Sequence, residues 1–172
     1  MNTHKTALIG VLIAATVIIA IVESFIPSVG IPGIKLGLAN IMVLVTLYEL
    51  GIKEAIWVNL ARVFLASLLR GTIFSMGFLM SLTGAVFSLT IMIIFYLLVR
   101  KFSIIGVSVI GAIFHVFGQI LVAMIYLGTA YILYYLPFIG IAAIVTGVFV
   151  GIVAKVIIRT GVIKKQREKY NF

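Results

Sequence analysis

The sequence contains no cysteine and no aspartate, and only four glutamates are set against thirteen lysines and arginines. Without cysteine, disulfides, zinc–thiolate sites and thiol nucleophiles are excluded. Without aspartate, the Asp-rich motifs that hold magnesium are excluded as well, and the phosphate-binding pattern GxxxxGK[ST] does not occur. The two histidines, His4 and His115, are too few for a polyhistidine metal site. We therefore expect no cofactor and no enzymatic activity.

Charge of either sign is scarce. Only 10% of the 172 residues are charged and 64% are hydrophobic, whereas a soluble domain carries about 25% charged residues. Such a chain needs lipid as its solvent. A membrane-spanning helix takes roughly 20 apolar residues, and the apolar runs are continuous rather than alternating, which disfavours a β-barrel. The composition therefore predicts an all-α integral membrane protein, with residues 1–172 forming one domain.

The apolar runs predict six transmembrane helices. The first run is longer than the core of a signal peptide, so we interpret it as a retained helix. A Pro- and Gly-rich stretch, residues 26–34, separates it from the second. The predicted helices cover about Thr6–Phe25, Lys35–Leu50, Ile52–Leu69, Phe74–Val99, Ile104–Leu127 and Leu136–Ile158. The Tyr-rich stretch 126–135 is either an aromatic belt or an interfacial turn.

The basic residues predict the orientation of these helices, because cytoplasmic loops are enriched in lysine and arginine. With six spans, both termini and the 2–3 and 4–5 loops share one side. Ten basic residues lie on that side and two on the other, with Arg62 inside the third helix. The ten are Lys5, Lys53, Arg100, Lys101, Lys155, Arg159, Lys164, Lys165, Arg167 and Lys169, and the two are Lys35 and Arg70. We expect a multi-pass protein of the cell membrane, with both termini and the basic tail from about residue 159 in the cytoplasm.

The net charge of +9 is explained by this topology and by anionic lipid headgroups rather than by nucleic acid.

A few polar side chains fall at membrane depth, where they are costly and tend to mark functional sites. In the predicted topology they gather in the outer half of the membrane, which indicates a water-filled or ligand-filled cavity that opens outward. His115 and Gln119 are four residues apart and Asn59 and Arg62 three apart, so each pair shares a helix face. The candidate substrate-binding residues are Glu23, Lys35, Asn40, Arg62, Ser81, His115 and Gln119.

Structural interpretations of the same residues remain open. Glu23 either faces a ligand or pairs with Arg62 or Lys35. His115 and Gln119 either face a ligand or only hydrogen-bond neighbouring helices, and Asn40 is also placed to cap the second helix. The linker 26–34 is either an ordinary turn or a loop that closes over the cavity.

Pairs of small residues four apart allow helices to approach closely. They include Gly77/Ser81, Gly84/Ser88 and Gly147/Gly151. In the first helix Gly10 and Ala14 have the same spacing, and they face either another helix of this chain or a partner subunit.

The run Pro32-Gly-Ile-Lys-Leu-Gly-Leu-Ala-Asn40 resembles the most recognisable segment of the Gx transporter family, which also carries the name heptaprenyl diphosphate synthase component I. The resemblance covers about residues 20–151. Val116 stands where the family's His-Asn-x-Gly-Gln segment has asparagine. Further similar positions are Glu23, Pro27, Arg62, Gly71, Ser81, Gly84, Ser88, Gly106–Ser108, Gly111–Ala112, His115 and Gly118–Gln119.

This resemblance implies a six-helix bundle similar to the S components of energy-coupling factor (ECF) transporters. Those subunits bind a micronutrient from outside and dock, through small residues of the first helix, on a transmembrane coupling subunit driven by two ATPases. Gly10 and Ala14 are the matching positions here. The implied function is a membrane-embedded substrate-binding subunit for uptake.

We expect its substrate to be a small anionic or amphipathic micronutrient, such as a flavin or a prenyl or quinone precursor, with Lys35 and Arg62 at the anionic group. The alternative is a non-catalytic membrane scaffold associated with isoprenoid or quinone biosynthesis. The name synthase conflicts with the residues, because prenyl transfer needs carboxylates that hold magnesium on a diphosphate.

Overall fold

The computed structural model describes residues 3–25, 35, 37–98 and 102–170. Within these ranges the chain is helical and contains no strand, which confirms the all-α prediction. The elements are α1 (Thr3–Glu23), α2 (Asn40–Glu49), α3 (Ile52–Leu69), α4 (Met76–Leu98), α5 (Ile104–Leu127), the 3-10 helix η1 (Ala130–Tyr135), α6 (Leu136–Thr160) and α7 (Val162–Tyr170). The predicted end of the fourth helix at Val99, the linker 26–34, Arg100 and Lys101 lie outside the described residues.

The largest error in the predicted boundaries concerns α2, which begins at Asn40 rather than at Lys35. Gly37 has a φ of 82°, in the left-handed region that ends helical geometry and favours glycine. Lys35 and Gly37 are therefore outside the helix, and Leu38 and Ala39 form a turn before it. By contrast, α3 and α5 begin and end at the predicted residues.

Four of the described segments are long and apolar enough to cross a membrane: α1, α4, α5 and the continuous stretch Ala130–Tyr170. This supports a multi-pass membrane protein. The ten residues of α2 span about 15 Å at 1.5 Å per residue, roughly half of a hydrocarbon core. Helix α3 has 18 residues and carries Lys53, Glu54 and Arg62. Helix length alone therefore does not decide whether the chain crosses the membrane six times.

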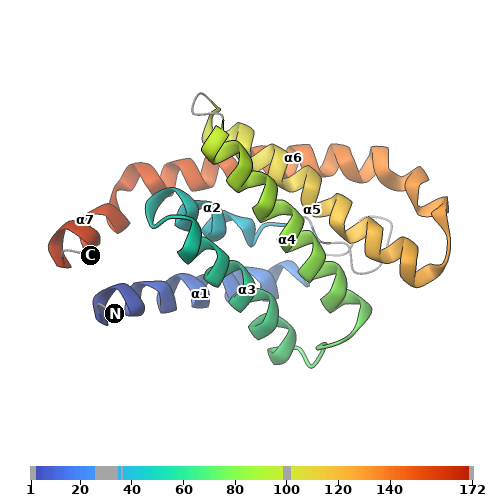
Figure 1. Cartoon of the computed structure of the whole chain (residues 1–172), viewed down its shortest axis with the longest axis horizontal. Coiled ribbons are helices and arrows are strands. Elements are labelled where there is room, and N and C mark those ends of the chain that lie inside the picture. The colour runs from blue at the N-terminus through green and yellow to red at the C-terminus, as the bar shows by residue number, and fades with distance from the viewer. Residues whose placement is uncertain (1–2, 26–34, 36, 99–101, 171–172) are drawn as a thin grey trace.

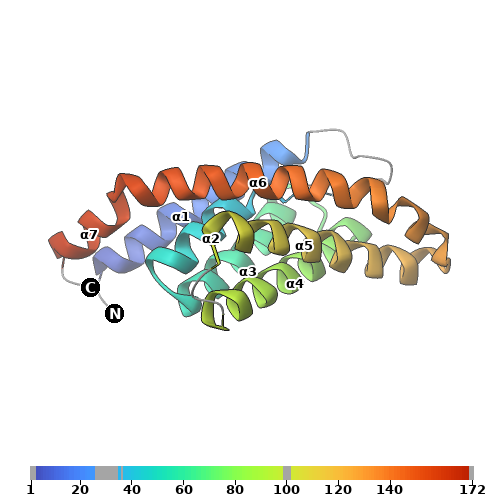
Figure 2. The same ribbon diagram turned by 90° about the horizontal axis from the view of Figure 1, so that it is seen from above.

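The helices form one elongated bundle in which both termini lie at the same end and η1 lies at the opposite end (Figure 1). In the view of Figure 2, α6 runs along one face and α3 and α4 along the other, with α2 between them. Its side chains Val43, Leu44, Val45 and Leu47 are fully buried. The short helix α2 is thus a core element of the bundle.

Three contacts fasten the end that holds the termini. Lys5 Nζ forms an ion pair of 2.5 Å with Glu54 of α3. The rings of His4 and Tyr170 stack with centroids 3.8 Å apart. Arg167 Nη1 of α7 donates to the Glu49 carbonyl at the end of α2, at 2.6 Å. The α2–α3 junction therefore lies at the same end as both termini.

Small residues bring α6 and α4 close to α5. A Cβ atom on Gly147 would lie 2.7 Å from Val109 Cα, and one on Gly84 would lie 2.8 Å from the His115 carbonyl oxygen. Gly10 and Ala14 behave differently. Both are exposed on α1, and a Cβ on Gly10 would meet no described atom within 4 Å. Among the described residues, the pair thus lies on an exposed face of α1 rather than in a contact between helices of this chain.

Candidate functional site

The described residues before α2, Lys35 and Gly37 to Ala39 (the 35–39 segment), are fixed inside the bundle by two side chains from other helices. The Glu23 carboxylate accepts hydrogen bonds from the Gly37 amide at 2.5 Å and the Ala39 amide at 3.4 Å. Gln119 forms a reciprocal pair with Lys35: its Oε1 accepts from the Lys35 amide at 2.9 Å, and its Nε2 donates to the Lys35 carbonyl at 3.3 Å. Backbone groups outside a helix need such partners in apolar surroundings.

These bonds give Glu23 and Gln119 a partner that the open alternatives did not contain. Glu23 binds the backbone of the 35–39 segment, and in the described part of the chain it forms no ion pair with Arg62 or Lys35. Gln119 likewise serves that segment rather than a neighbouring helix. Both side chains are buried. Their roles are to hold the segment in place from α1 and α5.

Arg62 is the centre of a second set of hydrogen bonds. It is buried on α3 with 4% of its surface exposed. Its Nη2 donates to Asn40 Oδ1 at 2.8 Å and its Nε to Asn59 Oδ1 at 3.1 Å. Asn40 Nδ2 donates to Ser88 Oγ at 3.3 Å, and Asn59 Nδ2 to the Ala85 carbonyl at 2.9 Å. The set joins α2, α3 and α4. It also shows that Asn40 does not cap α2 with its side chain.

His115 is packed between α4 and the 35–39 segment and is 2% exposed. A Cβ atom on Gly37 would lie 3.4 Å from its Cδ2, and one on Gly84 would lie 3.0 Å from its Cε1. Glycine at both positions thus admits the imidazole. Among the described residues, the buried His115 Nδ1 has no hydrogen-bond partner.

These groups surround a small cavity of about 10 Å³, roughly the room of one water molecule. Of the predicted site residues, five line it: Glu23, Lys35, Arg62, Ser81 and His115. Asn40 and Gln119 adjoin it through their hydrogen bonds. The full lining is Ala20, Glu23, Lys35, Gly37, Ala39, Arg62, Val63, Ala66, Ser67, Ser81 and His115. The sequence predicted a ligand-filled or water-filled cavity that opens outward. The structure brings the residues together around a space of about one water molecule.

The cavity carries an excess of positive charge, with two cations, Lys35 and Arg62, against the single carboxylate of Glu23. Since Glu23 is engaged by backbone amides, the arrangement is chemically suited to accept an anionic group.

Sequence reasoning left some contributors out of the site. The three-residue spacing that puts Asn59 and Arg62 on one helix face was visible in the sequence. The hydrogen bond from Asn59 to the Ala85 carbonyl was not. Ser88 stood out only for its small size, and Ser67, which lines the cavity, had no distinguishing pattern. Gly10 and Ala14 lie on α1 away from these residues.

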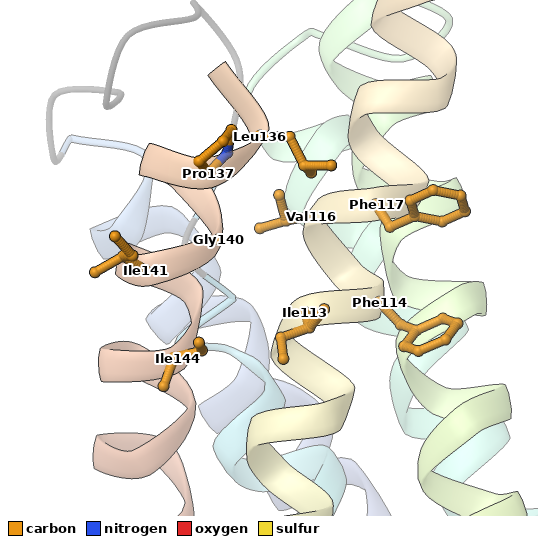
Figure 3. A pocket seen from close by; sticks show the side chains of 9 residues that line it. All are labelled: Ile113, Phe114, Val116, Phe117, Leu136, Pro137, Gly140, Ile141 and Ile144. Carbon is orange, nitrogen blue, oxygen red and sulfur yellow. The ribbon is translucent and has the colours of Figure 1, made fainter. Parts of the chain in front are cut away.

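A second concave region, also not anticipated, is an apolar groove of about 400 Å³ between α5 and α6. Figure 3 shows the side chains of Ile113 and Val116 on α5 facing those of α6, with Gly140 leaving room between them. Its lining is Ile113, Phe114, Val116, Phe117, Leu136, Pro137, Gly140, Ile141 and Ile144. In a membrane such a groove is in contact with hydrocarbon.

The family described as heptaprenyl diphosphate synthase component I matches residues 12–157. This range begins in α1, ends in α6 and contains every residue of the polar cavity. No curated protein and no solved structure matches the chain.

Proposed function

The chain belongs to the heptaprenyl diphosphate synthase component I family, and from this premise we propose that it is the substrate-binding subunit of an ECF-type uptake transporter. It captures a small anionic or amphipathic micronutrient, such as a flavin or a prenyl or quinone precursor, from outside the cell. The observation that carries the proposal is the buried cationic cavity, to which α1, α3, α4, α5 and the 35–39 segment contribute.

One buried cation, Arg62, and one half-buried cation, Lys35, beside one carboxylate support an anionic substrate. Removing Lys35 and Arg62 from water is expensive unless a counter-charge is supplied. The Glu23 carboxylate also accepts hydrogen bonds from the amides of Gly37 and Ala39, so it offsets only part of the positive charge. A bound anion would offset the rest. The apolar residues around the cavity, Ala20, Val63 and Ala66, suit a ligand that has an apolar part next to its charge.

The same residues favour binding over prenyl transfer. The family's name describes one component of a synthase, but prenyl transfer requires grouped carboxylates that hold magnesium on a diphosphate. The cavity contains one carboxylate, and across the described residues no three His, Asp or Glu side chains form a group that could hold a metal ion. We propose that the chain itself is not an enzyme.

In the proposed topology the chain crosses the cell membrane six times and both termini are cytoplasmic. The short helix α2 and the non-helical 35–39 segment together make one of these crossings, in the manner of the broken helices of transporters, whose non-helical backbone is buried in protein. The polar cavity then lies in the outer half of the membrane.

Uptake also needs an energy source, and we propose that a transmembrane coupling subunit and its ATPases provide it. The exposed face of α1 around Gly10 and Ala14 is the proposed docking surface. On this face Val11 and Ile18 are more than 60% exposed, and the absence of a side chain on Gly10 permits the close approach of a second helix.

A non-catalytic scaffold for an isoprenoid or quinone enzyme is the second candidate. The name of the family, which describes a component of a synthase, favours it. A scaffold would form a stable complex with a soluble enzyme, and the cavity residues would be needed for folding alone.

The test is mass spectrometry of small molecules that the purified protein retains, followed by binding measurements with the molecule found. We expect an anion whose affinity falls at least about tenfold in Arg62→Ala, the loss of one charge-assisted hydrogen bond. Lys53→Ala, at an exposed cation on the same helix, is the matched control. Unchanged affinity in Arg62→Ala and His115→Ala would refute the site, and a complex with a soluble synthase without coupling subunits would favour the scaffold.

A further inference from the structure

A groove that is separate from the polar cavity lies between α1 and α7, at the end of the bundle that holds both termini. In both views of the structure α7 lies beside the first turns of α1 (Figures 1 and 2), and the stacked rings of His4 and Tyr170 join the two helices. The groove has a volume of about 390 Å³, which is the size of a small-molecule site. Its lining is His4, Ala7, Leu8, Val11, Val162, Gln166 and Tyr170.

The lining changes from polar to apolar along α1. The polar ring of His4 lies at the start of the helix, and Leu8 and Val11 follow one and two turns later. Beyond the groove the exposed face of α1 continues with Ile18 and Val22, which are 61% and 58% exposed. A molecule that fits this surface has a polar head at the end with the termini and an apolar chain that runs along α1.

Positive charge lies beside the polar part of the groove. On α7 the lining residues Val162, Gln166 and Tyr170 are each four residues apart and so share one face of the helix. The same periodicity places Lys165 and Lys169 along one edge of this face. Both lysines are exposed, and Lys169 Nζ lies 5.2 Å from the centre of the Tyr170 ring. Two cations therefore flank the groove.

The other two cations of α7 have partners. Arg167 donates to a backbone carbonyl of α2, and Lys164 forms a loose ion pair with Glu168. Within the described ranges neither Lys165 nor Lys169 forms an ion pair. These two lysines are thus the ones whose charge no carboxylate of the described chain offsets, and an anionic headgroup would offset it.

We propose that the groove between α1 and α7 binds one anionic phospholipid, from the cytoplasmic leaflet in the proposed topology. Lys165 and Lys169 attract its phosphate, and Gln166 lies at its polar glycerol region. An acyl chain lies over Leu8 and Val11 and continues along α1. Basic pockets beside transmembrane helices suit anionic headgroups. The occupant is a lipid rather than a partner helix, because a lipid carries its charge at one end and its apolar chain at the other, as this groove requires.

This inference goes beyond the proposed uptake function, because none of the lining residues belongs to the polar cavity. It does touch the proposed docking surface. Val11 belongs both to the groove and to the exposed face of α1 around Gly10 and Ala14. A subunit docked on that face would therefore contact the bound lipid.

The experiment is native mass spectrometry of the delipidated full-length protein in detergent, which counts the lipid molecules that remain bound. Palmitoyl-oleoyl phosphatidylglycerol and palmitoyl-oleoyl phosphatidylcholine are titrated separately, so that the two lipids differ in the headgroup alone. We expect one tight site for phosphatidylglycerol, with an apparent Kd lower than that for phosphatidylcholine by about tenfold or more. Equal binding of the two lipids would overturn the proposal.

Two charge-matched double variants separate a site from diffuse attraction. Lys165→Gln with Lys169→Gln should raise the apparent Kd for phosphatidylglycerol by about tenfold and leave that for phosphatidylcholine unchanged. Arg159→Gln with Lys164→Gln is the control. It removes the same charge from exposed positions near the same end, but Arg159 belongs to α6 and Lys164 lies on the opposite side of α7 from the groove. An equal loss of affinity in both double variants would contradict a specific site.

A third variant tests whether the lipid lies in the groove. Ala7→Trp fills it from α1 and should abolish tight binding of phosphatidylglycerol, whereas Val145→Trp, at a position of α6 that is 63% exposed and outside the groove, should not. Tight binding that persists in folded Ala7→Trp would refute the location. A lipid-free dimer that Ala7→Trp separates would assign the groove to a second copy of the chain and overturn the proposal. If Ala7→Trp does not fold, the two lysine variants still decide the question.

Discussion

Glu23 is the residue whose role depends most on the backbone around it. Its carboxylate lies at the end of α1 and accepts from two amides of the segment that precedes α2. Such bonds to an ionised acceptor are stronger than neutral ones. The carboxylate thus acts as an anchor for the segment, and it also offsets part of the charge of the two cations in the cavity.

Replacing Glu23 should therefore lower the stability of the protein more than its affinity for a ligand. In Glu23→Ala the amides of Gly37 and Ala39 lose their partner, and each unsatisfied buried group costs about 1–3 kcal/mol. Glu23→Gln keeps one acceptor oxygen and should be intermediate. Thermal unfolding in detergent measures the change, with Glu168→Ala as control, because that carboxylate is 66% exposed in a loose ion pair with Lys164. A stability of Glu23→Ala equal to that of the control would contradict this role.

The sequence was informative about which residues gather and uninformative about what they bind. The polar positions at membrane depth did converge, and the Lys35–Asn40 run did lie at the centre. The partners of Glu23 and Gln119 are backbone atoms, and side-chain types do not reveal a backbone acceptor or donor. The sequence did not reveal the left-handed φ of Gly37 either, because glycine also occurs in many other conformations.

At the scale of elements, the contact between α5 and α6 offers a matched pair of glycines on one helix. A Cβ on Gly147 would lie 2.7 Å from Val109 Cα of α5, whereas one on Gly140, in the groove of Figure 3, would meet no described atom within 4 Å. We expect Gly147→Ala to destabilise the protein by about 1–3 kcal/mol, because the two backbones must separate. Gly140→Ala should be neutral or slightly stabilising, since alanine favours a helix.

Thermal unfolding of the two variants side by side provides the check. Both changes add one methyl group to α6, so the difference between them isolates the packing against α5. Equal unfolding midpoints would show that α6 does not pack on α5 at Gly147 in the membrane protein.

The exposed face of α1 leads to a prediction about partners. Gly10→Leu fills a position with no described neighbour within 4 Å, so the folded chain should tolerate it. If the coupling subunit docks there, the leucine should abolish co-purification of that subunit while ligand binding by the isolated protein persists. Val156→Leu, at an exposed position of α6, is the control. Undiminished co-purification in Gly10→Leu would exclude this face as the docking surface.

Helix boundaries were predictable where hydrophobic runs end in ordinary breaks. Helices α3 and α5 follow Gly51 and Ser103, and α5 ends at Gly128, which has a left-handed φ. Helix α7 was predicted only as a basic tail, because Ile163 is its one buried residue and a highly charged segment carries little helical signal. Its contacts with His4 and Glu49 depend on the distant N-terminus and α2.

At the scale of the whole molecule, the structure fixes which ends of the helices lie together. Contacts between α1 and α3, between α7 and α2, and between the two terminal helices place both termini and the α2–α3 junction at one end. That end carries Lys5 of α1, Lys53 of α3 and the four basic residues of α7. Because cytoplasmic loops are enriched in lysine and arginine, we propose that this end faces the cytoplasm.

The absence of cysteine makes this topology directly testable with single introduced cysteines. Ser75→Cys and Tyr131→Cys lie at the end with η1, and Lys53→Cys and Glu168→Cys lie at the end with the termini; all four positions are exposed. In intact cells a membrane-impermeant maleimide should label the first two alone, and after permeabilisation it should label all four. Labelling of Glu168→Cys in intact cells would reverse the orientation. Labelling of Lys53→Cys but not of Glu168→Cys would mean that α2, with its ten residues, does not complete a crossing, and the six-span topology would then be wrong.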